Sequence, residues 1–151
     1  MTSAKGESQF AIRPAIARDY ERIVEVWVAS GLPVKLQGRE SREAFVRQLQ
    51  SLPGLYLVAM DGERIVGVIL GSHDHRKGWI NRLAVLPEYR RRGIAADLVL
   101  ACERALQAEG MEITAALIEE DNATSRLLFE KLGYRADVPA AYYRKLTRPD
   151  A

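Results

Sequence analysis

The sequence of 151 residues contains one cysteine, Cys102, and no long apolar run. A single cysteine excludes an internal disulfide, so we expect Cys102 to be a small core residue in a reducing compartment. The most apolar strand-like segment, residues 65–70, is far shorter than a membrane span. The first eight residues lack the apolar core of a signal peptide and predict a flexible tail. These absences predict a cytoplasmic protein with no membrane partner.

An excess of charge is also missing, because 22 lysine and arginine residues face 20 acidic ones, for a net charge of +2. This balance argues against nucleic acid as a partner. The one basic cluster, Arg90 to Arg92, is short and has no interleaved aromatic residues on which bases would stack. His73 and His75 have no evident third ligand, so no metal site is predicted.

The remaining composition is that of an ordinary globular protein, with 48% apolar and 28% charged residues. The length predicts a single domain, which we place over residues 9–148 after a tail over residues 1–8. No internal repeat divides this domain.

Apolar residues at three- and four-residue spacing predict helices over residues 19–31, 41–50, 94–109 and 122–132. Segments rich in β-branched and aromatic residues predict strands over residues 9–13, 55–60, 64–70, 79–85, 111–118, 134–135 and 141–147. Asp61-Gly62 is a strong hairpin signal between the second and third strands. The helix between the strands at 79–85 and 111–118 makes that pair parallel. The prediction is therefore an α/β (α+β) fold with a mixed central sheet.

The segment from Leu83 to Ala95 joins a strand to a helix. Pro87 cannot continue the strand ladder, and the first amides of the following helix have no partner within the helix. Gly93 and Ala95 have little or no side chain, so a phosphate could approach these amides closely. The join predicts an anion site, and a solvated basic turn is the alternative.

Two sequence blocks resemble the GCN5-related N-acetyltransferase (GNAT) family in its small bacterial form. Arg-Arg-Arg-Gly-Ile-Ala at residues 90–95 is similar to the family signature Gln/Arg-x-x-Gly-x-Gly/Ala, after a strand that ends Leu-Ala-Val. Residues 121–134 resemble the second family block, and residues 73–79 resemble the hairpin before the fourth strand. The resemblance covers about residues 55–135. It implies a sheet of about six or seven strands with about four helices, in the order β-α-α-β-β-β-α-β-α-β-β.

The resemblance also implies acetyl-CoA as co-substrate. Its pyrophosphate would lie on Arg90, Arg91, Arg92, Gly93, Ile94 and Ala95. Backbone groups of Leu83, Ala84 and Val85 would meet the pantetheine arm and the thioester carbonyl. Asn122 and Phe129 would complete the cofactor site, although Asn122 is equally well interpreted as a helix cap.

The sequence departs from the family pattern where proton transfer is expected. The usual tyrosine acid is replaced by Phe129, and the strand at 79–85 carries no glutamate. Our candidates for the catalytic groups are Tyr134, Tyr143 and Glu120. Three weaker candidates are Tyr142, Glu119 and a water held by Asn81.

The resulting hypothesis is an N-acetyltransferase that moves an acetyl group from acetyl-CoA to a primary amine of a small molecule or protein. A catalytically weak acyl-CoA binding or sensing module is the alternative. The acceptor is not specified, because the loops expected to shape its site, residues 32–38 and 135–140, carry no motif. A homodimer is left open by the sequence.

Overall fold

The computed structural model describes residues 10–151, so the predicted tail over residues 1–8 lies outside the described residues. Short 3-10 turns precede α1 and α3, at Ala17–Asp19 and Pro87–Tyr89. The helices are α1 (Tyr20–Ala29), α2 (Arg42–Ser51), α3 (Ile94–Ala108) and α4 (Ala123–Lys131). The strands are β1 (Ala11–Pro14), β2 (Tyr56–Asp61), β3 (Arg64–His73), β4 (Gly78–Val85) and β5 (Thr114–Ala116). All four predicted helices are confirmed.

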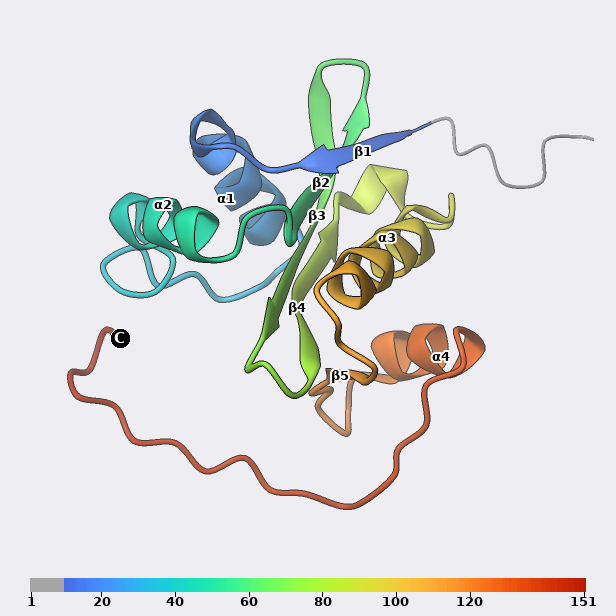
Figure 1. The fold of residues 1–151 in the computed structure, drawn as a ribbon. Helices are drawn as coiled ribbons and strands as arrows, with labels where there is room; N and C mark the ends of the chain where they lie inside the picture. The colour runs from blue at the N-terminus through green and yellow to red at the C-terminus, as the bar shows by residue number, and fades with distance from the viewer. Residues whose placement is uncertain (1–9) are drawn as a thin grey trace, which may run out of the picture.

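One mixed sheet organises the domain, with the strand order β1-β2-β3-β4-β5 (Figure 1). The first four strands pair antiparallel, with the β2–β3 turn at Gly62, whose φ of 58° is in the left-handed region. The β4–β5 pair is parallel, because α3 carries the chain back to the starting edge. The predicted hairpin and the predicted crossover are both confirmed.

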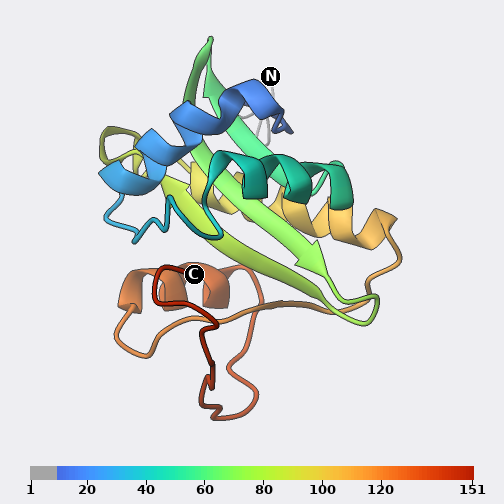
Figure 2. The same ribbon diagram turned by 90° about the vertical axis from the view of Figure 1, so that its left-hand side faces the viewer.

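Helices cover both faces of the sheet, with α1 and α2 on one side and α3 on the other (Figure 2). Two glycines of β3 let α3 approach closely. A Cβ on Gly67 would lie 3.0 Å from Leu98 Cδ1 and 3.1 Å from Ile94 Cγ2, and one on Gly71 would lie 2.7 Å from Cys102 Sγ. Close packing of this kind fixes the position of α3 on β3.

A β-bulge interrupts the β3–β4 ladder. Val68 pairs with Ala84 and Leu70 pairs with Asn81, so Ile69 alone faces the two β4 residues Arg82 and Leu83. Arg82 has a φ of 55°, which is unusual for a residue with a side chain. Bulges of this kind redirect side chains and are frequent next to active sites.

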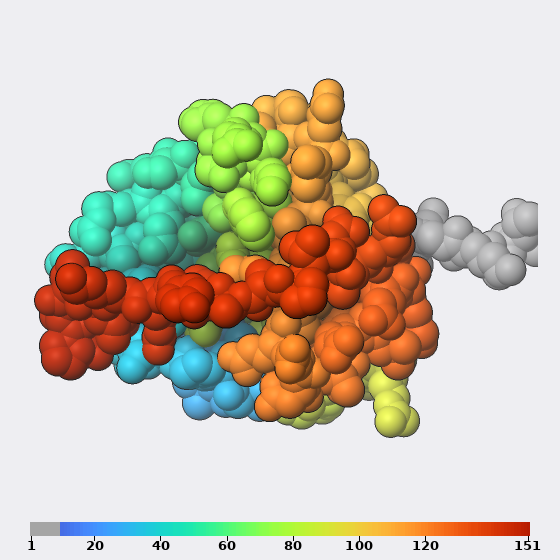
Figure 3. All heavy atoms as spheres, turned by 90° about the horizontal axis from the view of Figure 1, so that it is seen from below, coloured from blue at the N-terminus to red at the C-terminus, as the bar shows by residue number. Residues whose placement is uncertain are grey.

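The two strands predicted at residues 134–135 and 141–147 are wrong, and the sheet has five strands instead of six or seven. The predicted strand at 111–118 is reduced to the three residues of β5, which is too short an edge to order another strand. Residues 135–151 instead cross the lower side of the molecule as an extended segment (Figure 3). This segment ends at the α1–α2 loop, where the Arg148 guanidinium donates to the Gln37 carbonyl.

No helix within residues 10–151 has both the length and the apolar character needed to cross a membrane.

Candidate functional site

The start of α3 is the first half of the candidate site. Gly93 is its N-cap with a φ of 79°, and no side chain caps the helix. The first bond of the regular helical pattern runs from the Asp97 N–H to the Gly93 carbonyl, which leaves the N–H groups of residues 94–96 without an acceptor inside the helix. A Cβ on Gly93 would meet no protein atom within 4 Å. The space beside Gly93 is therefore open, at the positive end of the helix dipole.

Three exposed arginines surround this helix start, and Tyr89 holds the turn that carries them. The Tyr89 hydroxyl donates to Asp61 Oδ2 at 2.6 Å, and the Arg92 guanidinium lies 4.9 Å from the centre of the Tyr89 ring. Arg91 has a φ of 63°, so the turn contains two residues with positive φ, Arg91 and Gly93. The turn thus combines backbone N–H groups with exposed positive charge, an arrangement that suits a phosphate.

The second half of the site is the edge of β4 that faces β5. The two strands pair only from Gly78 with Thr114 to Ile80 with Ala116, and they separate beyond that point. Residues 81–85 therefore have no β5 partner on this edge. This stretch contains the bulge and leads directly into the turn before α3. A ligand lying between the separated strands would meet backbone groups first and the helix start at its far end.

The model of the acetyltransferase (GNAT) family matches residues 15–134, which span most of the described chain and include both halves of this site. The chain belongs to the GNAT family. Two curated relatives agree with this placement. An acetyltransferase of Photorhabdus laumondii is 34% identical over 116 residues, covering 77% of this chain and 80% of the relative. An acetyltransferase of Pectobacterium atrosepticum is 33% identical over 117 residues, covering 77% and 81%.

Solved structures share the GNAT fold. The PaiA N-acetyltransferase of Thermoplasma acidophilum, solved with coenzyme A, has a TM-score of 0.73 at 21% identity and covers 83% of this chain and 89% of its own. An AAC(6')-Iy structure, solved with a bisubstrate analogue of coenzyme A, has a TM-score of 0.72 at 21% identity and covers 91% and 98%. At this identity the likeness concerns the fold. Family and relatives together identify the chain as an N-acetyltransferase.

The predicted cofactor residues outside the turn lie on α4 and at its start. Asn122 is the N-cap of α4, and its side chain accepts from the Ser125 N–H at 3.1 Å. Phe129 is buried and makes an edge-on contact with Tyr134, with ring centres 5.0 Å apart. The roles of these residues toward the cofactor stay predictions.

The hydroxyl of the predicted acid Tyr134 donates a hydrogen bond to Glu103 Oε1 of α3, at 2.6 Å. Burial first, and this carboxylate second, raise the pKa of Tyr134 well above its usual range. Tyr143 is 91% exposed in the C-terminal segment, and Tyr142 beside it is 75% exposed. Glu120 is exposed before α4, where its backbone carbonyl accepts from Arg126. The structure thus spreads these candidates over separate elements.

The remaining weaker candidates lie on β4 and after β5. Asn81 donates to Ser72 Oγ at 3.3 Å, and Glu119 is exposed. His73 and His75 lie together on the β3–β4 hairpin, where His73 Nδ1 accepts from the His75 N–H. Within residues 10–151 no cluster of three or more metal-ligating side chains is present.

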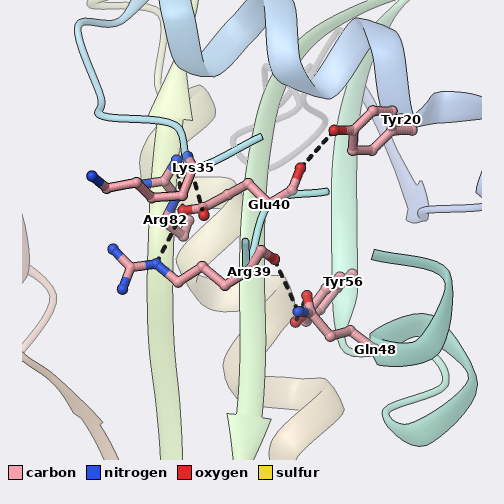
Figure 4. Close-up of polar contacts among 7 residues, drawn as sticks. All are labelled: Tyr20, Lys35, Arg39, Glu40, Gln48, Tyr56 and Arg82. Carbon is pink, nitrogen blue, oxygen red and sulfur yellow. Dashed lines mark hydrogen bonds and ion pairs between the residues drawn. The ribbon is translucent and has the colours of Figure 1, made fainter. Parts of the chain in front are cut away.

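Sequence reasoning missed a polar cluster on the α1–α2 side of the β4 bulge (Figure 4). Glu40, at the end of the α1–α2 loop, is 5% exposed. Its carboxylate lies 3.6 Å from Arg82 Nη2 of the bulge and 3.3 Å from Arg39 Nε. Its backbone carbonyl accepts from the Tyr20 hydroxyl at 2.6 Å. No local motif marks these positions, since they come from a loop, a helix and a strand.

The Arg82 guanidinium is held between the sheet and α1. Its central carbon lies 4.7 Å from the centre of the Trp27 ring, in a cation–π arrangement. Burial lowers the pKa of Arg82 from its usual value, and the nearby Glu40 carboxylate opposes this shift. Even a lowered arginine pKa leaves the side chain charged at neutral pH. The α1 face of the bulge therefore carries a fixed positive charge.

Proposed function

We propose that the chain transfers the acetyl group of acetyl-CoA to a primary amine by direct attack of the amine on the thioester. The observation that supports this most strongly is the continuity of the site along β4. An unpaired strand edge with a bulge leads into a helix start whose amides are free and whose N-cap is Gly93. A long ligand with an anionic end and an amide-bearing arm fits that shape.

Acetyl-CoA is the co-substrate, and each part of it has a counterpart along the site. The pyrophosphate lies on the N–H groups of residues 91–95, with Arg90 to Arg92 supplying charge. The pantetheine arm lies between the separated parts of β4 and β5, where it takes the backbone bonds that β5 does not make. The thioester then reaches the bulge at Leu83, whose N–H stabilises the developing oxyanion in this proposal.

The Val85 carbonyl accepts a hydrogen bond from the Ser30 hydroxyl at the end of α1, at 3.2 Å, so the end of β4 contacts the α1 side of the sheet. The acceptor enters from that side, between α1, the α1–α2 loop and the bulge. The attacking amine must be neutral, and an α-amine with a pKa of about 7.7–8.0 is far closer to neutral at pH 7 than a lysine with a pKa of about 10.4.

The leaving group is the coenzyme A thiolate. A thiol has a pKa of about 8.5, so the thiolate leaves without strict need of an acid. Tyr134 is a poor acid for the thiolate, because its hydroxyl already donates a hydrogen bond to the Glu103 carboxylate. In our proposal the thiolate is protonated by solvent or by the proton that the amine loses. The cytoplasm is the compartment we propose for this reaction, in keeping with the buried free thiol of Cys102.

Calorimetry with acetyl-CoA, followed by a thiol-release assay over a panel of amines, tests the proposal. We expect binding in the micromolar range and acetyl-CoA cleavage that depends on an added amine. Absence of binding would refute the donor site. Binding without turnover of any amine would instead favour the acyl-CoA binding or sensing module.

A further inference from the structure

Buried side-chain nitrogens without a hydrogen-bond partner occur at one place within residues 10–151. They are Trp27 Nε1 and the Nε and Nη2 atoms of Arg82. Arg82 Nη2 does face the Glu40 carboxylate at the ion-pair distance of 3.6 Å, which is beyond hydrogen-bond reach. Buried polar groups in proteins are hydrogen-bonded in the great majority of cases, so a local group without such bonds needs a reason. All three atoms are donors, and Nε with Nη2 forms the edge of a guanidinium that binds a carboxylate through two bonds. The ligand that suits them is therefore an oxygen acceptor, best a carboxylate.

The facing carboxylate of Glu40 is also loosely held. Its contacts are 3.3 Å to the Lys35 N–H, 3.3 Å to Arg39 Nε and 3.6 Å to Arg82 Nη2. Bonds between ionised partners are ordinarily about 2.7–2.9 Å. The carboxylate thus has remaining capacity to accept a hydrogen bond from an ammonium group. A donor edge and an acceptor edge lie opposite one another at the bulge.

The charges around this position favour a particular kind of acceptor. Arg39 and Arg82 supply two positive charges against the single negative charge of Glu40. A simple ammonium would add a third positive charge, whereas a zwitterion adds none. A hollow of about 520 Å³ adjoins the same loop, and its charged lining residues are Arg42, Glu43, Arg47 and Arg148. Two of these arginines are already paired, Arg42 with Glu21 and Arg148 with Asp150. The preference for a molecule that carries its own carboxylate therefore follows from the charges of Arg39, Arg82 and Glu40.

We propose that Arg82 and Glu40 form the acceptor subsite and that the acceptor is an α-amino acid with a free carboxylate. Arg82 binds the carboxylate, assisted by Trp27 Nε1, and Glu40 faces the ammonium group. Since Arg82 and Leu83 are the two bulge residues, an amine held by this pair lies beside the thioester position. The proposal rests on the proposed function, because it requires the thioester at the bulge.

The reaction then proceeds with balanced protons. The ammonium gives one proton to the Glu40 carboxylate, and the freed lone pair forms a bond to the thioester carbon. The carbon–sulfur bond breaks, and its electron pair leaves with the sulfur as thiolate. The nitrogen loses its second proton to that thiolate. The products are the N-acetyl amino acid and coenzyme A, and Glu40 returns its proton to solvent.

The test compares each free amino acid with its own carboxamide in the thiol-release assay with the full chain. The carboxamide keeps the side chain and the α-amine but lacks the negative charge. Its α-amine also has a lower pKa, so a larger fraction is neutral and the chemistry alone would favour the carboxamide. We expect kcat/KM of the best amino acid to exceed that of its carboxamide at least about tenfold, as for a bond between charged partners. Equal or better use of the carboxamide would overturn the proposal. That result would mean that the Arg82 and Trp27 nitrogens bind only an ordered water, which gives no preference between the two substrates.

Substitutions at the pair separate recognition from folding. In Arg82→Gln we expect the acid-to-amide ratio to fall to about one through a raised KM for the acid. Arg82→Lys keeps the charge without the two-bond edge, and an intermediate ratio is expected. The double variant Glu40→Gln with Arg82→Gln removes both charges, so it avoids leaving one buried charge unpaired. Arg22→Gln on the outer face of α1 is the matched control and keeps the full ratio.

Folding and the donor site are monitored in the same samples by thermal unfolding and by the Kd for acetyl-CoA. A double variant that unfolds near the wild-type temperature and retains the wild-type ratio would show that the pair is only structural. A chain that binds acetyl-CoA but acetylates amines without any carboxylate preference also overturns the subsite and leaves the proposed function intact. A chain that binds no acetyl-CoA overturns both.

Discussion

Gly93→Ala is the substitution that most directly tests the donor site. Gly93 has a φ of 79°, and an added Cβ would meet no protein atom within 4 Å. The folded state therefore suffers only the left-handed backbone strain, about 1 kcal/mol. For a domain of this size that corresponds to a fall in Tm of about 2–4 °C. The new methyl group would, however, lie where the pyrophosphate approaches the helix amides.

The expected effect on binding follows from the loss of close contact. A hydrogen bond from an amide to a charged group contributes about 1.5 kcal/mol or more, and 1.4 kcal/mol corresponds to a tenfold change in Kd. We therefore expect Gly93→Ala to weaken acetyl-CoA binding at least about tenfold, measured by calorimetry.

The matched control is Gly110→Ala at the other end of α3. Gly110 has a φ of 90° and likewise has no protein atom within 4 Å of an added Cβ. Its substitution should lower Tm by a similar amount and leave the Kd for acetyl-CoA unchanged. If both variants bind acetyl-CoA as the wild type does, the free amides of α3 do not hold the pyrophosphate, and our reasoning about the turn is wrong.

Three further outcomes are expected. Phe129→Tyr should leave kcat unchanged or raise it, since it restores the hydroxyl of the family pattern; a collapse of kcat at unchanged coenzyme A affinity would contradict this. Burial raises the pKa of Cys102 to about 12, so at pH 8 about one molecule in ten thousand carries the thiolate, and a thiol reagent should label Cys102 only after unfolding. Burial alone would raise the pKa of Asp19, but the bonds it accepts from Arg13 and from the Ile16 N–H lower it overall. Its stabilising contribution is therefore complete above about pH 4 and is lost as the pH falls through the lower folded pKa. In Asp19→Asn, the free energy of unfolding should no longer show this decrease at acid pH. An unchanged pH dependence would show that the Arg13–Asp19 ion pair does not contribute to stability.

The order of elements from β1 to α4 was predictable because each has a local cause. The apolar spacing of α1 and α3, the turn at Gly62 and the parallel crossover all depend on nearby residues. The segment after Gly133 was not predictable in this way. Residues 141–147 have the composition of a strand, but a strand needs a partner edge, and β5 offers only three residues. Composition alone does not report the length of the neighbouring edge.

The donor half of the site was predictable for the same reason, because its residues are neighbours in the sequence. Residues 83–95 form strand, turn and helix start in one stretch, so their spacing predicts how backbone groups are presented. The structure adds the bulge, which no residue type announces, because a bulge is a property of the pairing between Val68–Leu70 and residues 81–84. The positive φ of Arg82 follows from that pairing and not from the arginine itself.

The acceptor subsite that we propose was out of reach of the sequence for a different reason. Trp27, Glu40 and Arg82 are separated by 13 and 42 positions, and each has an ordinary interpretation when taken alone. Trp27 belongs to the apolar face of a helix, Glu40 precedes a helix start, and Arg82 interrupts a strand. Only the fold places the three together and reveals that their donors lack acceptors. Substrate choice depends on buried groups of this kind, so the acceptor that we propose could be inferred only from the structure, whereas acetyl-CoA as the donor was predicted from the sequence.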